Sequence, residues 1–330
     1  MKCIMSPFTL CYENIAAEEY LLNNMNEDIF LLYINEPCII VGKNQNTYSE
    51  INQNYVRQHH LPVVRRMSGG GAVYHDLGNL NFCFIADNKG KEIDAVFREY
   101  TNPVLDVLHN LGVPAEFTGR NDLSVNGKKI SGNAQYYTSS KVLHHGTMLF
   151  DSDIQSIAAS LNVSEEKFID KAVKSVRSRV GNISDYLDSP LSIQELSKLI
   201  TNHVMSSFSD CEIYSLSQED MNSIKKLVER KYATHEWNYN AFSEFTFKNT
   251  LKCSGGNVEL RLNLNKGIIN NVNIYGDFFG KKDIKELESL LINKPYDFTV
   301  IEKTLSSVDM DDYISGLSLS QFLQNIFDFN

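Results

Sequence analysis

The sequence lacks three features that would each point to a particular class of protein. Its longest apolar runs, such as residues 30–34, are far below the roughly 20 residues that a membrane span needs. Its first residues do not form the extended apolar stretch of a secretory signal. Basic residues are outnumbered, with 31 Lys and Arg against 41 Asp and Glu and a net charge of −10. That balance argues against a general binder of nucleic acid or anionic membranes, and we expect a soluble cytoplasmic chain.

Closely spaced cysteines are also missing. The six cysteines stand at positions 3, 11, 38, 83, 211 and 253, without a Cys-x-x-Cys pair. The chain has 330 residues, of which 42% are apolar, and this is enough for a packed core. We therefore expect the cysteines to be reduced and to serve as small buried hydrophobic residues. A catalytic role for one of them stays open at this point.

Helical and strand patterns alternate in the first third of the chain, and helical patterns dominate from about residue 153 to 223. Helices are expected over residues 14–26, 93–111, 282–292 and 317–329, and strands over residues 30–34, 38–41, 62–66, 72–74, 80–85, 123–125, 129–130, 245–253, 257–264 and 268–275. The strand at 62–66 is expected to resume at 72–74. After Trp237 the pattern changes to three strands and two helices, which predicts a small α+β unit of roughly 85–90 residues. We expect two domains, residues 1–240 and residues 241–330.

The most informative segment runs from Arg65 to Asn81 and contains three consecutive glycines between two strand patterns. Glycines let the backbone approach a ligand closely and direct N–H groups at it. The two preceding arginines and Ser68 add donors that suit a carboxylate or a phosphate. The segment therefore predicts an anion-binding loop, and the alternative is a glycine-rich hairpin with solvated arginines. It matches neither a Walker loop nor a dinucleotide fingerprint.

A second segment, Gly119 to Ala134, contains Asp122, Lys128 and Lys129 around Asn126-Gly127, which is a strong two-residue turn signal. Residues on the two arms of a hairpin face each other, so Asp122 and Lys129 could share one site. One lysine of an adjacent pair usually faces solvent, because neighbouring side chains in a strand point to opposite faces. An ammonium directed at an anionic oxygen would stabilise charge during group transfer. The alternative is an ordinary surface hairpin.

A third segment begins with His144-His145 and continues Gly-Thr-Met-Leu. No carboxylate or cysteine stands beside the two histidines at metal-ligand spacing, so we expect a partly buried pair at the start of a strand. Residues 175–179 place two arginines two positions apart, and on their own they indicate a solvated helical face.

Taken together, these segments resemble the lipoate–protein ligases, ATP-dependent enzymes that attach lipoic acid to carrier domains. The likeness rests on the following runs: Arg65-Arg-x-Ser-Gly-Gly-Gly-Ala-Val-Tyr-His-Asp-x-Gly-Asn79, Gly119-Arg-Asn-Asp122, Lys129-Ile-Ser-Gly-Asn-Ala134, His144-His-Gly-Thr-Met-Leu149 and residues 175–180. It spans at least residues 12–180, and the 240–330 unit is similar in size and place to the C-terminal accessory domain of these ligases. The sequence departs slightly from the pattern of this family at residues 81–83 and 180–182.

The resemblance implies an α/β fold with a central mixed β-sheet flanked by helices, shared with biotin protein ligases, and a small α+β C-terminal domain. The Gly-Arg-Gly-Arg loop of biotin ligases is absent, which favours lipoate. The site residues that the resemblance implies are Lys129 as the central catalytic lysine; Arg66, Gly71, Ala72, Val73, Tyr74, His75, Asn79, Asp122 and Lys129 for ATP or the adenylate; Arg66, Ser68, Gly70, Gly71, Lys129 and His145 for lipoate; and Asp122 for Mg²⁺.

The family's reaction would proceed in two steps on lipoate or octanoate, through lipoyl-AMP, and would end on a lysine of a lipoyl carrier domain. The expected carriers are the acyltransferase subunits of 2-oxoacid dehydrogenases and the H protein of glycine cleavage. Two alternatives stay open. One is an octanoyl or lipoyl transferase of the same superfamily, with or without a cysteine thioester, and the other is a non-catalytic protein that binds lipoyl-adenylate.

Overall fold

The computed structural model describes residues 1–88, 90, 93–119, 121–161, 179–239, 247–265 and 267–327. The chain divides into two compact units. The first comprises Met1–Val41, Tyr48–Arg66 and Ala72–Asn238, and the second comprises Gly42–Thr47, Met67–Gly71 and Tyr239–Asn330. Two short loops of the N-terminal half therefore belong to the same compact unit as the C-terminal residues.

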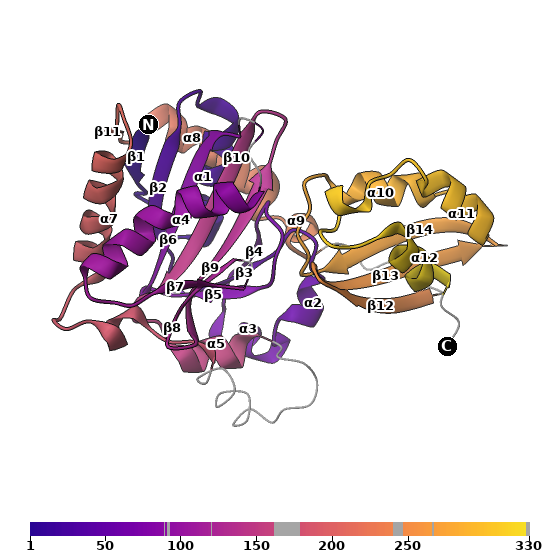
Figure 1. The fold of residues 1–330 in the computed structure, drawn as a ribbon, viewed down its shortest axis with the longest axis horizontal. Helices are drawn as coiled ribbons and strands as arrows, with labels where there is room; N and C mark the ends of the chain where they lie inside the picture. The colour runs from indigo at the N-terminus through magenta and orange to yellow at the C-terminus, as the bar shows by residue number, and fades with distance from the viewer. Residues whose placement is uncertain are drawn as a thin grey trace. The chain divides into compact units, whose positions relative to one another are not determined.

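A mixed β-sheet forms the centre of the first unit (Figure 1). Within the described residues it has eight strands in the order β11-β1-β2-β6-β10-β9-β8-β7. Strands β11, β1 and β2 are parallel neighbours, and the other neighbours are antiparallel. The bounds are β1 (Lys2–Met5), β2 (Ile29–Ile34), β6 (Asn79–Asp87), β7 (Glu116–Thr118), β8 (Asp122–Val125), β9 (Lys128–Tyr137), β10 (Lys141–Leu149) and β11 (Glu212–Ile213). The predicted mixed sheet is confirmed.

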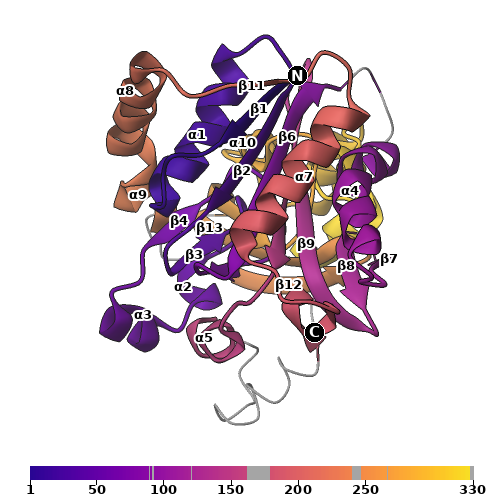
Figure 2. The ribbon, with the colours of Figure 1, turned by 90° about the vertical axis from the view of Figure 1, so that its left-hand side faces the viewer.

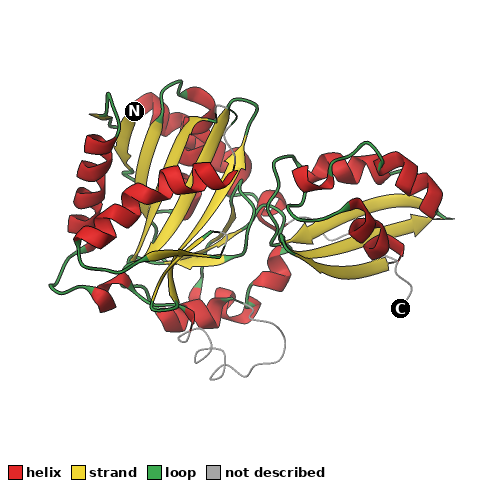
Figure 3. Cartoon of the chain, viewed as in Figure 1, coloured by secondary structure: helices red, strands yellow, loops and turns green. Residues whose placement is uncertain are grey.

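The helices that flank this sheet are α1 (Cys11–Asn24), α4 (Ile93–Asn110) and α7 (Ile193–Ser207), and α8 (Gln218–Leu227) packs against α1 (Figures 2 and 3). Alternation along the strands decides what each helix covers. Phe30, Phe82 and Phe84 point to one face and pack into a core with apolar residues of α4 and α7. Side chains one position along the strands point to the other face, where α1 lies. This second face carries polar groups, among them His145 and Glu18, and is called the polar face.

A smaller sheet in the first unit, in the order β4-β3-β5, corrects one expectation. Strands β4 (Val63–Arg65) and β5 (Val73–His75) do not continue each other; they pair with opposite sides of β3 (Cys38–Val41). The intervening glycine-rich loop therefore crosses from one edge of β3 to the other. The remaining elements are α2 (Thr47–Glu50), α3 (Gln53–His59), α5 (Ile154–Ser160), α9 (His235–Tyr239), and the short turns of helix η1 (Ile183–Tyr186) and η2 (Val228–Tyr232).

The second unit contains an antiparallel sheet, β12 (Phe247–Cys253), β13 (Gly256–Asn265) and β14 (Ile268–Gly276), so the three predicted strands are confirmed. Helices α10 (Ile284–Leu291), α11 (Phe298–Leu305) and α12 (Leu319–Phe327) share an apolar core with this sheet. Helix α11 was not predicted, because its β-branched residues disfavour a helix. The signal was Asp297, whose side chain caps the helix by accepting from the backbone N–H of Val300. No helix in the described parts of the chain is long and apolar enough to cross a membrane.

Candidate functional site

The hairpin predicted around Asn126-Gly127 is confirmed by the antiparallel pairing of β8 with β9. Asn126 has a φ of 50° and Gly127 a φ of 76°. Two successive residues in the left-handed region form the tight turn that matches the twist of the flanking strands, and Asn-Gly adopts it at little cost. The local sequence therefore fixes the register of the two arms next to the turn.

A β-bulge then decides which of the two adjacent lysines faces Asp122. Asp122 lies opposite Gly132, yet Ser124, two residues further along β8, lies opposite Lys129 rather than Ile130. A shift of one residue moves a side chain to the other face of the sheet, so the extra residue brings Lys129 to the face of Asp122. The Nζ atom of Lys129 lies 2.8 Å from Oδ1 of Asp122, and their side chains are 38% and 30% exposed. The expectation that these two residues face each other across the hairpin is confirmed, and both side chains are partly exposed.

The hydrogen bonds around His75 show which of its two ring nitrogens carries the hydrogen. The amide of Asn14 donates to the backbone oxygen of Phe8 and, over 2.8 Å, to Oδ1 of Asn35, so the Asn35 amide nitrogen is the donor toward Nδ1 of His75, 3.0 Å away. The ring hydrogen therefore sits on Nε2. This buried Nε2 has no hydrogen-bond partner among the described residues. A buried N–H without a partner is costly, and a bound acceptor would remove that cost.

Burial, together with the nearby Arg66 and His145, lowers the pKa of His75 to about 3. The ring is therefore neutral at physiological pH and acts as a hydrogen-bond donor rather than a positive charge. Burial also lowers the pKa of the Arg66 guanidinium, to about 10, although Glu18 opposes this shift. Arg66 consequently remains positively charged at physiological pH.

The two adjacent histidines face opposite sides of the large sheet, because they lie in the middle of β10. The expectation that they stand at the start of a strand is wrong. His144 is opposite Phe84 of β6 and points toward α4, whereas His145 is opposite Cys83 and points toward α1. Alternation thus gives one histidine to the core and the other to the polar face.

A buried carboxylate that the sequence reasoning missed holds His145. Glu18 of α1 is 1% exposed, and its oxygens accept from Nδ1 of His145 over 2.9 and 3.0 Å and from the hydroxyl of Tyr33 over 3.0 Å. Glu18 lies three residues after Ile15 and four before Leu22, on the face of the helix that is buried. A charged residue at a core position was the signal that could have identified it, since buried charges are paired and are often functional.

The two arginines before the glycines have different surroundings. Both are buried, at 2% and 6% exposed, so the alternative of solvated arginines is wrong. Arg65 donates from its guanidinium to the backbone oxygens of Trp237 and Asn238, over 3.0 and 3.1 Å. Arg66 donates to the backbone oxygen of Ile40 over 3.3 Å and lies in the field of Glu18. Arg65 is thus bound to main chain, and Arg66 is the arginine next to the polar face.

The glycine-rich loop belongs to the second unit, where it is held from two sides. The oxygen of Ser68 accepts from the N–H of Lys43, and the N–H of Gly70 donates to the oxygen of Phe278. A β-carbon at Gly69 would lie 2.5 Å from that same oxygen, so only glycine fits there. At Gly71, by contrast, a β-carbon would have no described heavy atom within 4 Å. The loop is packed at one end and open at the other.

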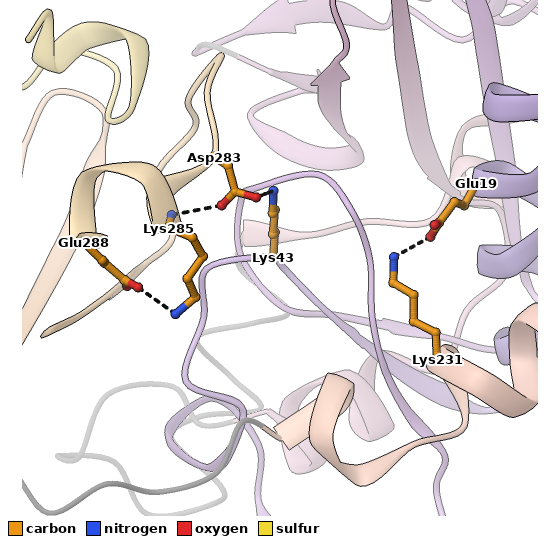
Figure 4. A network of polar contacts seen from close by, with 6 residues as sticks. All are labelled: Glu19, Lys43, Lys231, Asp283, Lys285 and Glu288. Carbon is orange, nitrogen blue, oxygen red and sulfur yellow. Dashed lines mark hydrogen bonds and ion pairs between the residues drawn. The ribbon is translucent and has the colours of Figure 1, made fainter. Parts of the chain in front are cut away.

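Lys43, at the base of this loop, forms an ion pair of 3.0 Å with Asp283 (Figure 4). Asp283 caps α10 by accepting from the N–H of Lys285, and Lys285 pairs in turn with Glu288 over 2.7 Å. Burial alone would raise the pKa of Asp283, but the hydrogen bond from Lys285 and the charge of Lys43 lower it below its usual value. The figure also shows the pair that Lys231 forms with Glu19 over 2.5 Å in the first unit.

The segment after the glycines supplies partly exposed apolar residues and a buried hydrogen-bond acceptor in the first unit. Ala72 and Val73 are partly exposed, and Tyr74 is buried, with a pKa that burial raises to about 12. Asn79 donates to Oδ1 of Asn81, while its own buried Oδ1 has no partner among the described residues. Asn79 therefore resembles His75, because each has one buried polar atom without a hydrogen-bond partner among the described residues.

The cysteines do not offer a nucleophile at the polar face. All six are free, four of them buried and two partly buried. Cys83 lies in the middle of β6 as expected, and burial, followed by the neighbouring Glu18, raises its thiol pKa well above the usual value. A thiolate is the reactive form, so this residue does not suit a thioester mechanism. Arg120 and residues 175–178 lie outside the described residues, and in the described part no three His, Cys, Asp or Glu side chains group as a metal site would.

His144 makes the folded state sensitive to acid. Gln135 accepts from Tyr137 and so donates to Nδ1 of His144, which leaves Nε2–H to donate to Thr101. Burial, and then His145, lower the pKa of His144 to about 3. Because the unfolded value is about 6.5, the unfolded state binds the proton first, and stability falls as the pH drops from 6.5 toward 3.

We expect His144→Asn to be less stable than the wild type at pH 7.5 but less sensitive to acid between pH 6.5 and 5. The slope of the unfolding free energy should fall by up to about 1.4 kcal/mol per pH unit, which is the contribution of one titrating histidine. Denaturant titrations at several pH values measure this slope, and equal slopes for the two proteins would contradict the assignment.

Comparison with known proteins agrees with the resemblance. Residues 11–205 match the family described as lipoyl protein ligase A/B catalytic domain, and residues 243–326 match bacterial lipoate protein ligase C-terminus. The lipoate-protein ligase LplJ of Bacillus subtilis is 41% identical over 95% of this chain and 96% of its own length. Lipoate–protein ligase 1 of Staphylococcus aureus is 42% identical over 94% of this chain and 95% of its own length.

Solved structures give the same result. The lipoate complex of LipL1 from P. falciparum has a TM-score of 0.79 at 25% identity and covers 99% of this chain and 98% of that one. A bipartite lipoate protein ligase from Thermoplasma acidophilum, described together with its E2 lipoyl domain, has a TM-score of 0.67 at 29% identity. The match covers 74% of this chain and 98% of that one. A lipoate-protein ligase A bound with ATP has a TM-score of 0.64 at 25% identity, and the match covers 73% of this chain and 100% of that one. With both halves matched and relatives above 40% identity over nearly its whole length, this chain belongs to the lipoate–protein ligase family.

Proposed function

We infer that the chain is an ATP-dependent lipoate–protein ligase, which joins lipoate to a lysine of a carrier protein and cleaves ATP to AMP and pyrophosphate. The observation that carries this function is the placement of Lys129 by the bulge of β9, on the same face as Asp122 and open to a ligand. The relatives that match nearly the whole chain are ligases of this kind.

The reaction needs an activated acyl group, because a carboxylate has no good leaving group. In the first step an oxygen of the lipoate carboxylate attacks the α-phosphorus of ATP, and the bond from that phosphorus to the β-phosphate oxygen breaks. Lipoyl-adenylate and pyrophosphate result. In the second step a carrier lysine attacks the acyl carbon, loses a proton, and AMP leaves as the amide forms. The chain's task in both steps is to orient the reactants and to stabilise negative charge.

Lys129 is the residue that we propose for charge stabilisation. Its ammonium would contact oxygens of the acyl and phosphate groups in both steps, without becoming a covalent nucleophile. Arg66 would supply a second positive charge, and the neutral His75 would donate from Nε2. The proposed ATP and adenylate contacts are Arg66, Gly71, Ala72, Val73, Tyr74, His75, Asn79, Asp122 and Lys129, and the proposed lipoate contacts are Arg66, Ser68, Gly70, Gly71, Lys129 and His145.

Asp122 fits a magnesium ion that accompanies the nucleotide. Magnesium usually keeps several waters and takes one or two protein carboxylates beside the phosphate oxygens, so a single partly exposed carboxylate is suitable. When bound, the ion would neutralise charge on the phosphates. We further propose residues 1–240 as the catalytic domain, residues 241–330 as the accessory domain, and lipoyl domains of 2-oxoacid dehydrogenases and the glycine cleavage H protein as the carriers.

The first half-reaction can be tested without a carrier, by exchange of labelled pyrophosphate into ATP. We expect exchange that requires lipoate, since formation of lipoyl-adenylate is reversible while pyrophosphate is present. Octanoate in place of lipoate measures the preference for the acyl chain. A folded protein that binds lipoate and ATP and yet catalyses no exchange would contradict the proposed function.

A further inference from the structure

Gly132 occupies an unusual position beside Lys129. A β-carbon built on Gly132 would lie 2.8 Å from Nζ and 2.9 Å from Cε of Lys129, and 3.7 Å from Oδ1 of Asp122. Non-bonded carbon contacts are normally about 3.5–4.0 Å. The end of the lysine side chain therefore fills the volume that any other residue at position 132 would need.

The backbone at this point is held from both sides. Gly132 lies opposite Asp122 in β8. On its other side the N–H of Gly132 donates to the hydroxyl of Thr147 over 3.2 Å, and that hydroxyl donates to the oxygen of Gly132 over 3.4 Å. Because the strand is fixed between two neighbours, a new side chain at 132 would displace the lysine rather than the backbone.

We propose that Gly132 is a positioning residue for Lys129: its missing side chain lets the ammonium lie across β9 next to Asp122. The proposal rests on the proposed function, because it takes Lys129 to be the group that contacts the acyl and phosphate oxygens. The bulge at Ile130 selects the face on which Lys129 lies, and Gly132 leaves the space for its ammonium.

Gly132→Ala is expected to move the side chain of Lys129 without lowering the stability of the fold. The crowded atoms are the end of a flexible side chain that is 38% exposed, so Lys129 can rotate away at little cost. Gly132 does not have a positive φ, so alanine fits its backbone conformation. Replacing glycine by alanine at such a position also restricts the unfolded chain, which offsets small losses. We expect an unchanged melting temperature.

The first readout does not depend on ligase activity. The full-length, ligand-free protein is treated with a limiting amine-acylating reagent, and the modification of Lys129 and Lys128 is measured by peptide mass spectrometry. Gly132→Ala should change the labelling rate of Lys129 about two- to five-fold, the factor that corresponds to loss of an exposed ion pair, and leave Lys128 unchanged. Gly181→Ala is the control: its β-carbon would lie 3.2 Å from the hydroxyl of Tyr186 and 3.3 Å from Cδ of Lys128, away from the end of the Lys129 side chain. Alanine also keeps the backbone N–H that donates to the oxygen of Lys129.

The second readout is turnover. A displacement of a catalytic group by about 1 Å can cost 10²-fold, so we expect the kcat of Gly132→Ala to fall about 10- to 100-fold, with smaller changes in KM for ATP and lipoate. Gly181→Ala should keep wild-type turnover. In a Lys129→Ala background, Gly132→Ala should have no further effect on the residual transfer from chemically prepared lipoyl-adenylate, since there is no ammonium left to displace.

Two results would overturn the proposal: unchanged labelling of Lys129 in Gly132→Ala, or an equal loss of transfer with and without the lysine. A wild-type protein that forms no lipoyl-adenylate would instead contradict the proposed function, and the labelling experiment would still decide whether Gly132 positions the lysine.

Discussion

Lys129→Ala is expected to slow lipoylation by about 1,000-fold or more, which corresponds to about 4 kcal/mol of lost transition-state stabilisation. The reason is geometric. The bulge in β9 places Lys129 on the same face as Asp122, and the missing side chain of Gly132 leaves room for the Lys129 ammonium beside Asp122. Removal of Lys129 leaves the negative charge that develops on the acyl and phosphate oxygens without this donor. Single-turnover labelling of a carrier domain measures the loss.

Lys128→Ala is the matched control, because it removes an identical charge one residue away. Lys128 pairs with Val125 at the turn, where the strand has not yet shifted in register, and it does not pair with Asp122. We expect nearly wild-type labelling from this variant and unchanged melting temperatures for both. A Lys129→Ala protein that labels the carrier at the wild-type rate would remove the lysine from the mechanism.

Arg65→Met is expected to produce the largest loss of stability, about 3–5 kcal/mol. The guanidinium is 2% exposed and donates to the backbone oxygens of Trp237 and Asn238, while the indole N–H of Trp237 returns a hydrogen bond to the Arg65 oxygen over 2.9 Å. Methionine fills much of the volume but leaves the buried carbonyl of Asn238 and the partly buried carbonyl of Trp237 without these donors, and each such loss costs about 1–3 kcal/mol.

Thermal unfolding of Arg65→Met should accordingly occur roughly 10 °C below the wild type, since 1 kcal/mol shifts a domain of this size by about 2–4 °C. Arg57→Met, on an exposed residue of α3, is the control and should change stability by less than about 0.5 kcal/mol. An Arg65→Met protein as stable as this control would show that the buried hydrogen bonds of Arg65 contribute little.

Local patterns were sufficient to predict the hairpin and many of the strands, but not β1, β7, β11 or the full length of β10. Asn126-Gly127 specifies a two-residue turn on its own, and the turn brings Asp122 and Lys129 to the same end of the sheet. The choice between Lys128 and Lys129 could not be derived in this way. It depends on the extra residue at Ile130, and a bulge is visible only when the partner strand is known.

The roles of paired residues in the sequence also depended on tertiary structure. Arg65 and Arg66 look alike in the sequence, but Arg65 donates to the backbone of residues 237–238, over 170 positions away, whereas Arg66 donates to the backbone oxygen of Ile40. His144 and His145 differ because α4 covers one face of β10 and α1 the other. Long-range packing of this kind leaves no local pattern, which is also why Glu18 was missed as the partner of His145.

The ligase activity is tested most simply by the intact mass of a purified apo-lipoyl domain after incubation with this protein, lipoate and Mg-ATP. We expect a lipoyl mass shift on one lysine that requires ATP and is lost with Lys129→Ala but kept with Lys128→Ala. A folded protein that forms no lipoyl-adenylate and transfers nothing to any of several carrier domains would contradict it.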